Sequence, residues 1–135
     1  MTTFYSQYDT NVIGWQELLN NFNESVERQE HVRHVPLGFF VSHTADRMQK
    51  VQSLMKKLGC DTAHLYMNVS QHGGSFGNHV DDVDVYFWQC QGSTKWEVEG
   101  QDYILAPGDM IYVPKGVYHN VIPLTPRAGI SMGVS

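Results

Sequence analysis

Two segments in the first half of the chain space their apolar residues as an amphipathic helix does. Apolar side chains recur three and four positions apart along residues 14–26 and again along residues 44–58, which places them on one side of an α-helix. Thr10 or Asn11 is a candidate N-cap for the first helix, and Thr44 for the second. The two stripes are Trp15, Leu18, Leu19, Phe22 and Val26, and Met48, Val51, Leu54, Met55 and Leu58.

The remainder of the chain has the pattern of short strands, which makes the fold mainly β. A polar connection at residues 27–34 leads to residues 38–42, an aromatic and β-branched run that predicts a strand. From about residue 63, short apolar or alternating runs are separated by turn residues, which predicts an antiparallel sandwich or barrel with both helices packed on its outside. These runs are residues 63–69, 80–89, 94–98, 101–105, 110–113, 117–122 and 129–134.

Length, charge and cysteine content narrow the function classes. The 135 residues predict a single domain, helical at about residues 1–60 and a barrel at about residues 61–135. The net charge of −5 and the lack of a Lys/Arg-rich run argue against a nucleic-acid partner. The sequence has neither an apolar run of membrane-span length nor a signal-peptide pattern at its start, so we expect a cytoplasmic protein with no membrane partner. Cys60 and Cys90 are expected to be reduced thiols.

Three residues have the chemistry of a metal site. His79 and Asp81 are two positions apart, so on a strand their side chains point to the same face and can reach one ion. His119, at a Pro/Gly turn, is the best third ligand. Two histidines and one carboxylate form the facial triad of non-haem Fe(II) oxygenases, although Mn, Ni or Zn also suit these donors. The alternative is a buried hydrogen-bonded cluster that holds no metal.

These residues lie within two longer patterns. The run Gly108-x5-Pro114-x-Gly116-x2-His119 resembles the second cupin motif at each of its fixed positions. Residues 73–89 form a Gly-rich loop, a His-x-Asp pair and an acidic and apolar run, with Gly92 and Trp96 after them. This stretch is similar to the JmjC-type cupins, and above all to their ribosomal-oxygenase branch. The resemblance implies a double-stranded β-helix, Fe(II) on His79, Asp81 and His119, 2-oxoglutarate as co-substrate, and hydroxylation as the reaction.

The sequence departs from that branch where the far carboxylate of 2-oxoglutarate would bind. The family has a basic residue fifteen positions after the first metal histidine, and this chain has Thr94 there. Lys95 is adjacent, but strand alternation turns it to the opposite, wet face. We expect Arg127 to replace the missing cation, because a guanidinium can bind a carboxylate through two hydrogen bonds. Tyr66 and Asn68, which share a strand face, and Thr94 are further candidates for co-substrate contacts.

The sequence is compatible with functions of three different classes. An Fe(II)/2-oxoglutarate oxygenase would hydroxylate an unidentified small molecule or peptide. A small metallocupin that does not use 2-oxoglutarate, such as an isomerase, a lyase or a direct dioxygenase, would use its metal mainly as a Lewis acid. A non-enzymatic cupin that binds a metal or small ligand is a third alternative. A homodimer is compatible with the barrel, whose apolar sheet face could pair with a second copy.

Overall fold

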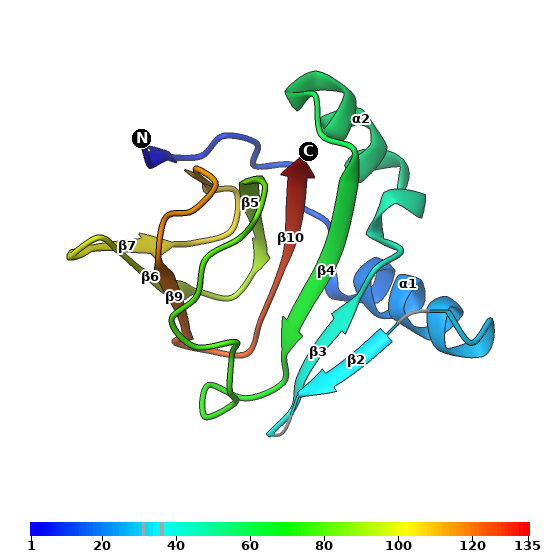
Figure 1. The fold of residues 1–135 in the computed structure, drawn as a ribbon. Helices are drawn as coiled ribbons and strands as arrows, with labels where there is room; N and C mark the ends of the chain where they lie inside the picture. The colour runs from blue at the N-terminus through cyan, green and yellow to red at the C-terminus, as the bar shows by residue number, and fades with distance from the viewer. Residues whose placement is uncertain (31, 36) are drawn as a thin grey trace.

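The computed structural model describes residues 1–30, 32–35 and 37–135, and its ribbon is a β-barrel flanked by helices (Figure 1). The helices are α1 (Trp15–Glu27), a 3₁₀ turn (Ala45–Arg47) and α2 (Gln49–Leu58). No helix of the described residues is long and apolar enough to cross a membrane. The strands are β1 (Thr3–Tyr5), β2 (Val32–Val35), β3 (Phe39–Ser42), β4 (Thr62–Asn68), β5 (Asp84–Gln91), β6 (Thr94–Val98), β7 (Gln101–Leu105), β8 (Met110–Val113), β9 (His119–Pro123) and β10 (Arg127–Val134).

The strands form two antiparallel sheets that face each other. The larger has seven strands in the order β1-β8-β5-β10-β4-β3-β2, and the smaller has three in the order β7-β6-β9. Alternation along the strands sends one set of side chains between the sheets, where Phe87, Trp96, Val98, Leu105 and Ile111 are buried. This architecture confirms the predicted mainly β fold, and it places the inner faces of β4, β5 and β10 opposite β6 and β9.

The helices pack on the outer face of the seven-stranded sheet as predicted, although Leu19 and Val26 of the predicted α1 stripe are exposed. Leu18 of α1 and Val51 of α2 are fully buried in one cluster with Trp88 and Ile130 of the sheet. Burying an aliphatic side chain of this size is worth about 1.5–3 kcal/mol, so a few such contacts hold each helix in place. The polar sides of the helices face solvent, and the two faces of the sheet therefore carry two separate cores.

Several details differ from the sequence-based expectations. The expected connection at residues 27–34 contains β2, and the first residues form β1, which pairs with β8. Both are short strands at the two edges of the sheet, and their structure depends on pairing with a neighbour rather than on a local pattern. The expected helix at residues 44–58 is a 3₁₀ turn followed by α2. Thr44 does not cap it, because its hydroxyl bonds to those of Ser25 and Ser42.

Candidate metal centre

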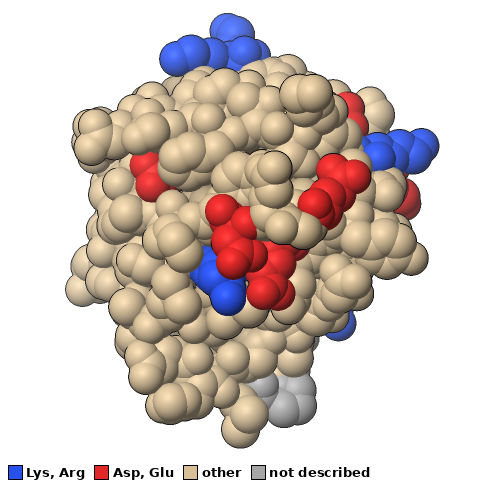
Figure 2. Space-filling view, turned by 90° about the vertical axis from the view of Figure 1, so that its left-hand side faces the viewer, with Lys and Arg blue, Asp and Glu red and all other residues tan. Residues whose placement is uncertain are grey.

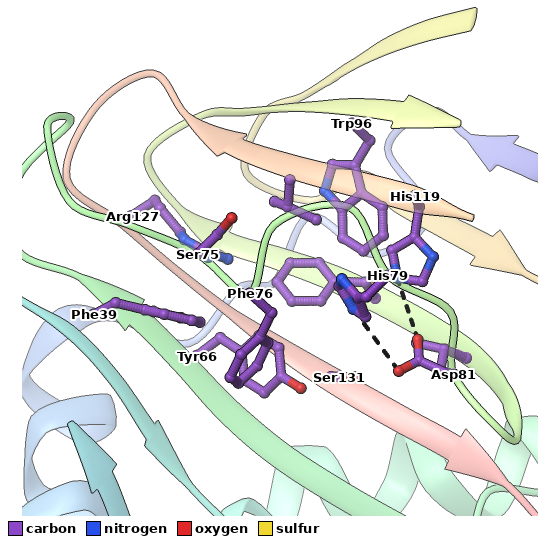
Figure 3. Close-up of a pocket in the computed structure, with 13 residues that line it drawn as sticks. Phe39, Tyr66, Ser75, Phe76, His79, Asp81, Trp96, His119, Arg127 and Ser131 are labelled. Atoms are coloured by element: carbon purple, nitrogen blue, oxygen red, sulfur yellow. Dashed lines mark ion pairs between the residues drawn. The ribbon is translucent and has the colours of Figure 1, made fainter. Parts of the chain in front are cut away.

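Three side chains from two separate segments of the chain converge at one end of a pocket in the barrel. One nitrogen or oxygen atom from each of His79, Asp81 and His119 lies within 4.8 Å of the others. The Nε2 of His119 is 3.2 Å from Oδ2 of Asp81, and the Nε2 of His79 is 3.9 Å from Oδ1 (Figure 3). The structure therefore brings together the three residues that the sequence predicted as metal ligands, and their binding of a metal stays a prediction.

Backbone pairing sets the separation of the two imidazoles. The N–H of His79 donates to the carbonyl of His119, and the N–H of His119 donates to the carbonyl of His79, both across 2.9 Å. His119 begins β9, whereas His79 lies before β5, which begins only at Asp84 rather than at residue 80 as expected. This single bridge joins the segment before β5 of the large sheet to the small sheet and holds both rings on one side.

Each imidazole has one nitrogen engaged and one available. The Nδ1 of His79 lies 2.7 Å from the carbonyl of Gly77, and the Nδ1 of His119 lies 2.9 Å from the carbonyl of Val117. Because a carbonyl can only accept, each Nδ1 carries the proton and each Nε2 keeps its lone pair. Backbone partners of this kind orient histidine ligands in metal sites. Both lone pairs lie on the side of Asp81, as a shared cation requires.

Asp81 is held in its anionic form. When the His119 ring carries a second proton, its Nε2–H donates to the carboxylate, and this hydrogen bond and the charge of nearby protonated imidazoles lower the pKa of the carboxyl below its usual value, against an opposing effect of partial burial. Asp84, the first residue of β5, accepts a hydrogen bond from the backbone N–H of Lys115 at 2.8 Å and is not part of the cluster. Two neutral imidazoles and one carboxylate fit a divalent ion of the Fe, Mn, Ni or Zn class.

A pocket leads from these residues into the barrel. Its middle is aromatic: the Phe76 ring packs edge-to-face against Phe39 and Tyr66, with centroids 5.1 and 5.8 Å apart, and also approaches His79. The free cavity is only about 20 Å³, room for about one water molecule. In Figure 3 the Phe76 ring lies between the His/Asp cluster and Arg127, and all of these residues line the pocket.

Arg127 is a buried cation with one nitrogen unpaired. Its side chain is 1% exposed, and its Nε–H donates to Oδ1 of Asn68 across 2.7 Å. Its guanidinium lies 5.4 Å from the Phe39 ring centroid and 5.8 Å from that of Phe87. Its Nη1 has no hydrogen-bond partner among the described residues. Burial lowers the pKa of Arg127 to about 10, which still leaves it charged at neutral pH.

The other residues predicted for the co-substrate take different places. Tyr66 lines the pocket. Asn68 does not line it but positions Arg127, and its Nδ2 donates to the carbonyl of Gly74 at 2.8 Å. Thr94 is fully buried and its hydroxyl donates to Oε1 of Gln89 at 3.0 Å, outside the residues that line the pocket.

The outer face of the small sheet carries the charged residues of β6. Lys95 points there and lies 3.5 Å from the carboxylate of Glu97, as alternation predicted. Figure 2, which views this side of the molecule, shows acidic side chains gathered around basic ones. Lys95 is therefore turned away from the pocket and offers nothing to a ligand inside it.

Sequence reasoning missed the aromatic part of the pocket. Phe39 comes from β3, far from the motifs, and carried no signal of its function. Phe76 lies in the Gly-rich loop, where an aromatic residue among glycines was the available signal. Trp96 of β6 also lines the pocket, and it stacks on His119 with ring centroids 5.6 Å apart and planes 13° apart.

Comparison with known proteins relates part of the barrel to a family. Residues 65–127, slightly less than half of the chain, match the cupin domain family. The fold of the chain is similar to that of the ribosomal oxygenase YcfD from Escherichia coli in complex with cobalt and 2-oxoglutarate, with a TM-score of 0.80 at 18% identity over 100% of this chain and 48% of YcfD. KdgF from Halomonas sp. gives a TM-score of 0.57 at 20% identity over 78% of this chain and 88% of KdgF. At these identities the likeness shows the fold alone.

The curated proteins that match this chain are longer proteins, and each match covers only part of both sequences. The chain is 47% identical over 49 residues to 3-hydroxyanthranilate 3,4-dioxygenase of Rattus norvegicus, 36% of this chain and 17% of that protein. It is 30% identical over 76 residues to the bifunctional lysine-specific demethylase and histidyl-hydroxylase NO66 of Branchiostoma floridae, 54% of this chain and 12% of that protein. The chain thus spans about half of YcfD and less than a fifth of these curated relatives.

Proposed function

We propose that this protein is an Fe(II)- and 2-oxoglutarate-dependent oxygenase that hydroxylates a small molecule or a peptide. One observation carries the proposal: a pocket with His79, Asp81 and His119 at one end has a buried, incompletely paired guanidinium, that of Arg127, at the other. A metal site alone has no use for a buried cation. A co-substrate that chelates a metal through one end and carries a carboxylate at the other uses both.

The metal end fits a resident ferrous ion. The ring tautomers set by Gly77 and Val117 leave both Nε2 atoms free to bind, and Asp81 supplies a negative charge. With three protein ligands, other coordination positions remain for exogenous groups. When bound, Fe(II) with 2-oxoglutarate and O₂ supplies the oxidising chemistry, whereas the protein contributes the ligands, their orientation and a dry pocket.

The far end suits a carboxylate. Asn68 holds the Nε edge of Arg127, so the guanidinium presents its terminal nitrogens. A charged hydrogen bond in a pocket that excludes water is stronger than one in solvent. Neither Thr94, which is engaged with Gln89, nor Lys95, on the outer face, competes for this role. In our proposal Arg127 supplies from β10 the cation that the ribosomal-oxygenase pattern has at the position of Thr94.

The position of Phe76 limits the free volume of the pocket between the metal ligands and Arg127. The free cavity of about 20 Å³ is too small for a five-carbon diacid, so the Phe76 ring has to move before 2-oxoglutarate enters. An adjoining groove of about 150 Å³, lined by His64 and Asp82, shares Tyr66, Asp81 and Ser131 with the pocket. We assign this groove to the hydroxylated substrate, because a group there lies beside the metal without crossing the Arg127 end.

The test is the affinity for 2-oxoglutarate of Mn(II)-loaded protein under anaerobic conditions. We expect the wild type to bind and Arg127→Ala to bind at least about 10-fold more weakly, since a hydrogen bond to a charged group is worth about 1.5–3 kcal/mol. Arg28→Ala, at an exposed arginine, is the matched control and should bind as the wild type does. Unchanged binding by Arg127→Ala would remove Arg127 from the site.

The second candidate is a metallocupin that does not use 2-oxoglutarate. It is favoured by the small free cavity and by the 47% identity over 49 residues to a protein named as a 3,4-dioxygenase. In this case the metal acts on the substrate directly, and the pocket binds only a small ligand. Failure of the wild type to bind 2-oxoglutarate at millimolar concentration would decide for this second function.

A further inference from the structure

Two donors, not one, are left without a partner in the pocket. Besides Nη1 of Arg127, the indole Nε1 of Trp96 is buried and has no hydrogen-bond partner among the described residues. Trp96 is 3% exposed and lines the same pocket. The contrast is Trp88, whose indole N–H donates to the carbonyl of Asp9 at 3.0 Å. Leaving a buried N–H unpaired costs about 1–3 kcal/mol, so two in one cavity suggest that a ligand completes them.

The chemistry of these donors specifies what they bind. An indole and a guanidinium can donate hydrogen bonds but cannot accept them. They come from opposite walls, Trp96 from β6 of the small sheet and Arg127 from β10 of the large sheet. Neither can satisfy the other, and a ligand that presents an ammonium group could satisfy neither. The ligand between them must carry acceptor oxygens.

The position of the indole nitrogen indicates which oxygens these are. Trp96 stacks on His119 through its ring face, so its N–H edge is free of that contact. In Figure 3 the nitrogen lies on the edge of the ring toward Arg127. Because Asn68 occupies the Nε edge of Arg127, the guanidinium has fewer nitrogens left for a carboxylate, whose two oxygens accept several hydrogen bonds. A second donor is required at this end.

We propose that Trp96 is a ligand-binding residue whose indole N–H donates to the same far carboxylate that Arg127 binds. The inference rests on the proposed function and extends it to the choice of co-substrate. Together the two donors select a 2-oxo acid with a second carboxylate over one that ends in a methyl group. Trp96 also stacks on His119. In this proposal the residue that binds the far carboxylate therefore also contacts a metal ligand, which aligns the bound diacid with the metal.

The experiment compares two probes in two proteins. Binding of 2-oxoglutarate and of 2-oxobutyrate, which lacks the far carboxylate, is measured with Mn(II)-loaded wild type and Trp96→Phe. Phenylalanine keeps an aromatic ring on His119 but removes the N–H. We expect 2-oxoglutarate to bind about 10-fold more weakly to Trp96→Phe, with 2-oxobutyrate and Mn(II) affinities within twofold of wild type. Trp15→Phe, on α1, is the matched control and should change neither.

A measurement on the unmutated protein covers the case in which Trp96→Phe does not fold. In Zn(II)-loaded protein with ¹⁵N-labelled tryptophan, 2-oxoglutarate should shift the Trp96 indole N–H resonance far more than that of Trp88. Equal weakening of both probes by Trp96→Phe, or an unmoved Trp96 resonance in a protein that binds 2-oxoglutarate, would overturn the assignment of Trp96 alone. A wild type that binds no 2-oxoglutarate would overturn the proposed function and this inference with it.

Discussion

Arg127 and Asn68 face each other across β10 and β4, and the Nε–H of the arginine donates to the amide oxygen of the asparagine at 2.7 Å. No carboxylate of the described residues forms an ion pair with Arg127. A buried cation with a neutral partner costs stability, because the amide supplies a hydrogen bond but no opposite charge. The site thus keeps a destabilising group whose benefit appears only when an anion binds.

Replacing this cation with an apolar residue should stabilise the ligand-free protein. We expect Arg127→Met to raise the free energy of unfolding in urea by about 1 kcal/mol or more, because it removes the buried charge at similar volume, while 2-oxoglutarate binding is lost. Burial lowers the pKa of Arg127 from its usual value to about 10, so the guanidinium loses its proton at lower pH in the folded than in the unfolded state, and the penalty is relieved only above pH 10. The difference should therefore be constant from pH 6 to 9. A variant less stable than wild type would show that the charge is compensated.

The metal ligands give the second prediction. His79→Ala and His119→Ala should each lose stoichiometric metal, because each removes one of three converging donors. Metal content after dialysis against divalent ions, measured by mass spectrometry, is the readout. His72→Ala, an exposed histidine of the Gly-rich loop, is the matched control and should retain the metal. Full metal content in both ligand variants would refute the site.

Thr94 provides a test of whether the usual anchor position has any ligand role here. Its hydroxyl donates to Gln89 inside the barrel wall, and Thr94→Val keeps the shape while removing that bond. We expect the free energy of unfolding in urea to be about 1 kcal/mol lower than that of the wild type. The affinity for 2-oxoglutarate should stay within twofold of the wild-type value. A drop in affinity of 10-fold or more would return Thr94 to the ligand site.

Gly129 provides a prediction about packing behind the pocket. A Cβ at this position of β10 would lie 2.4 Å from the ring of Phe87 and 2.9 Å from the carbonyl of Trp88. Phe87 is buried and also lines the pocket, so it has little freedom to move. We expect Gly129→Ala to lower the free energy of unfolding by about 1–3 kcal/mol. Wild-type stability would show that Phe87 can rearrange.

Local patterns were sufficient for the residues whose relation is short-range. The two-residue spacing of His79 and Asp81 and the turn before His119 predicted a convergence that the structure contains. Alternation along β6 predicted correctly that Thr94 is buried and that Lys95 faces out. The inference for β6 depends on strand alternation, which the sequence determines directly. His79 and Asp81 lie before β5 rather than on a strand, so their convergence with His119 depends on the backbone bridge between His79 and His119.

Relations across the fold could not be derived in this way. The approach of Phe76 to Phe39, and the hydrogen bond from Arg127 to Asn68, depend on how β3, β4 and β10 pair, which is set by tertiary packing. Arg127 was selected by its chemistry rather than by its contacts. Likewise β1 and β2 are three and four residues long, too short for a period-two pattern to be distinguished from a loop.

The bridge between His79 and His119 joins parts of the chain that belong to different sheets, and Asp81 completes the cluster from the same loop as His79. A bound divalent ion would therefore act as a cross-link at the mouth of the barrel, in addition to the two backbone hydrogen bonds of the bridge between His79 and His119. Because such an ion binds the folded chain and not the unfolded one, resistance to unfolding becomes a function of free metal concentration. Cells short of the metal would hold a looser barrel as well as an inactive one.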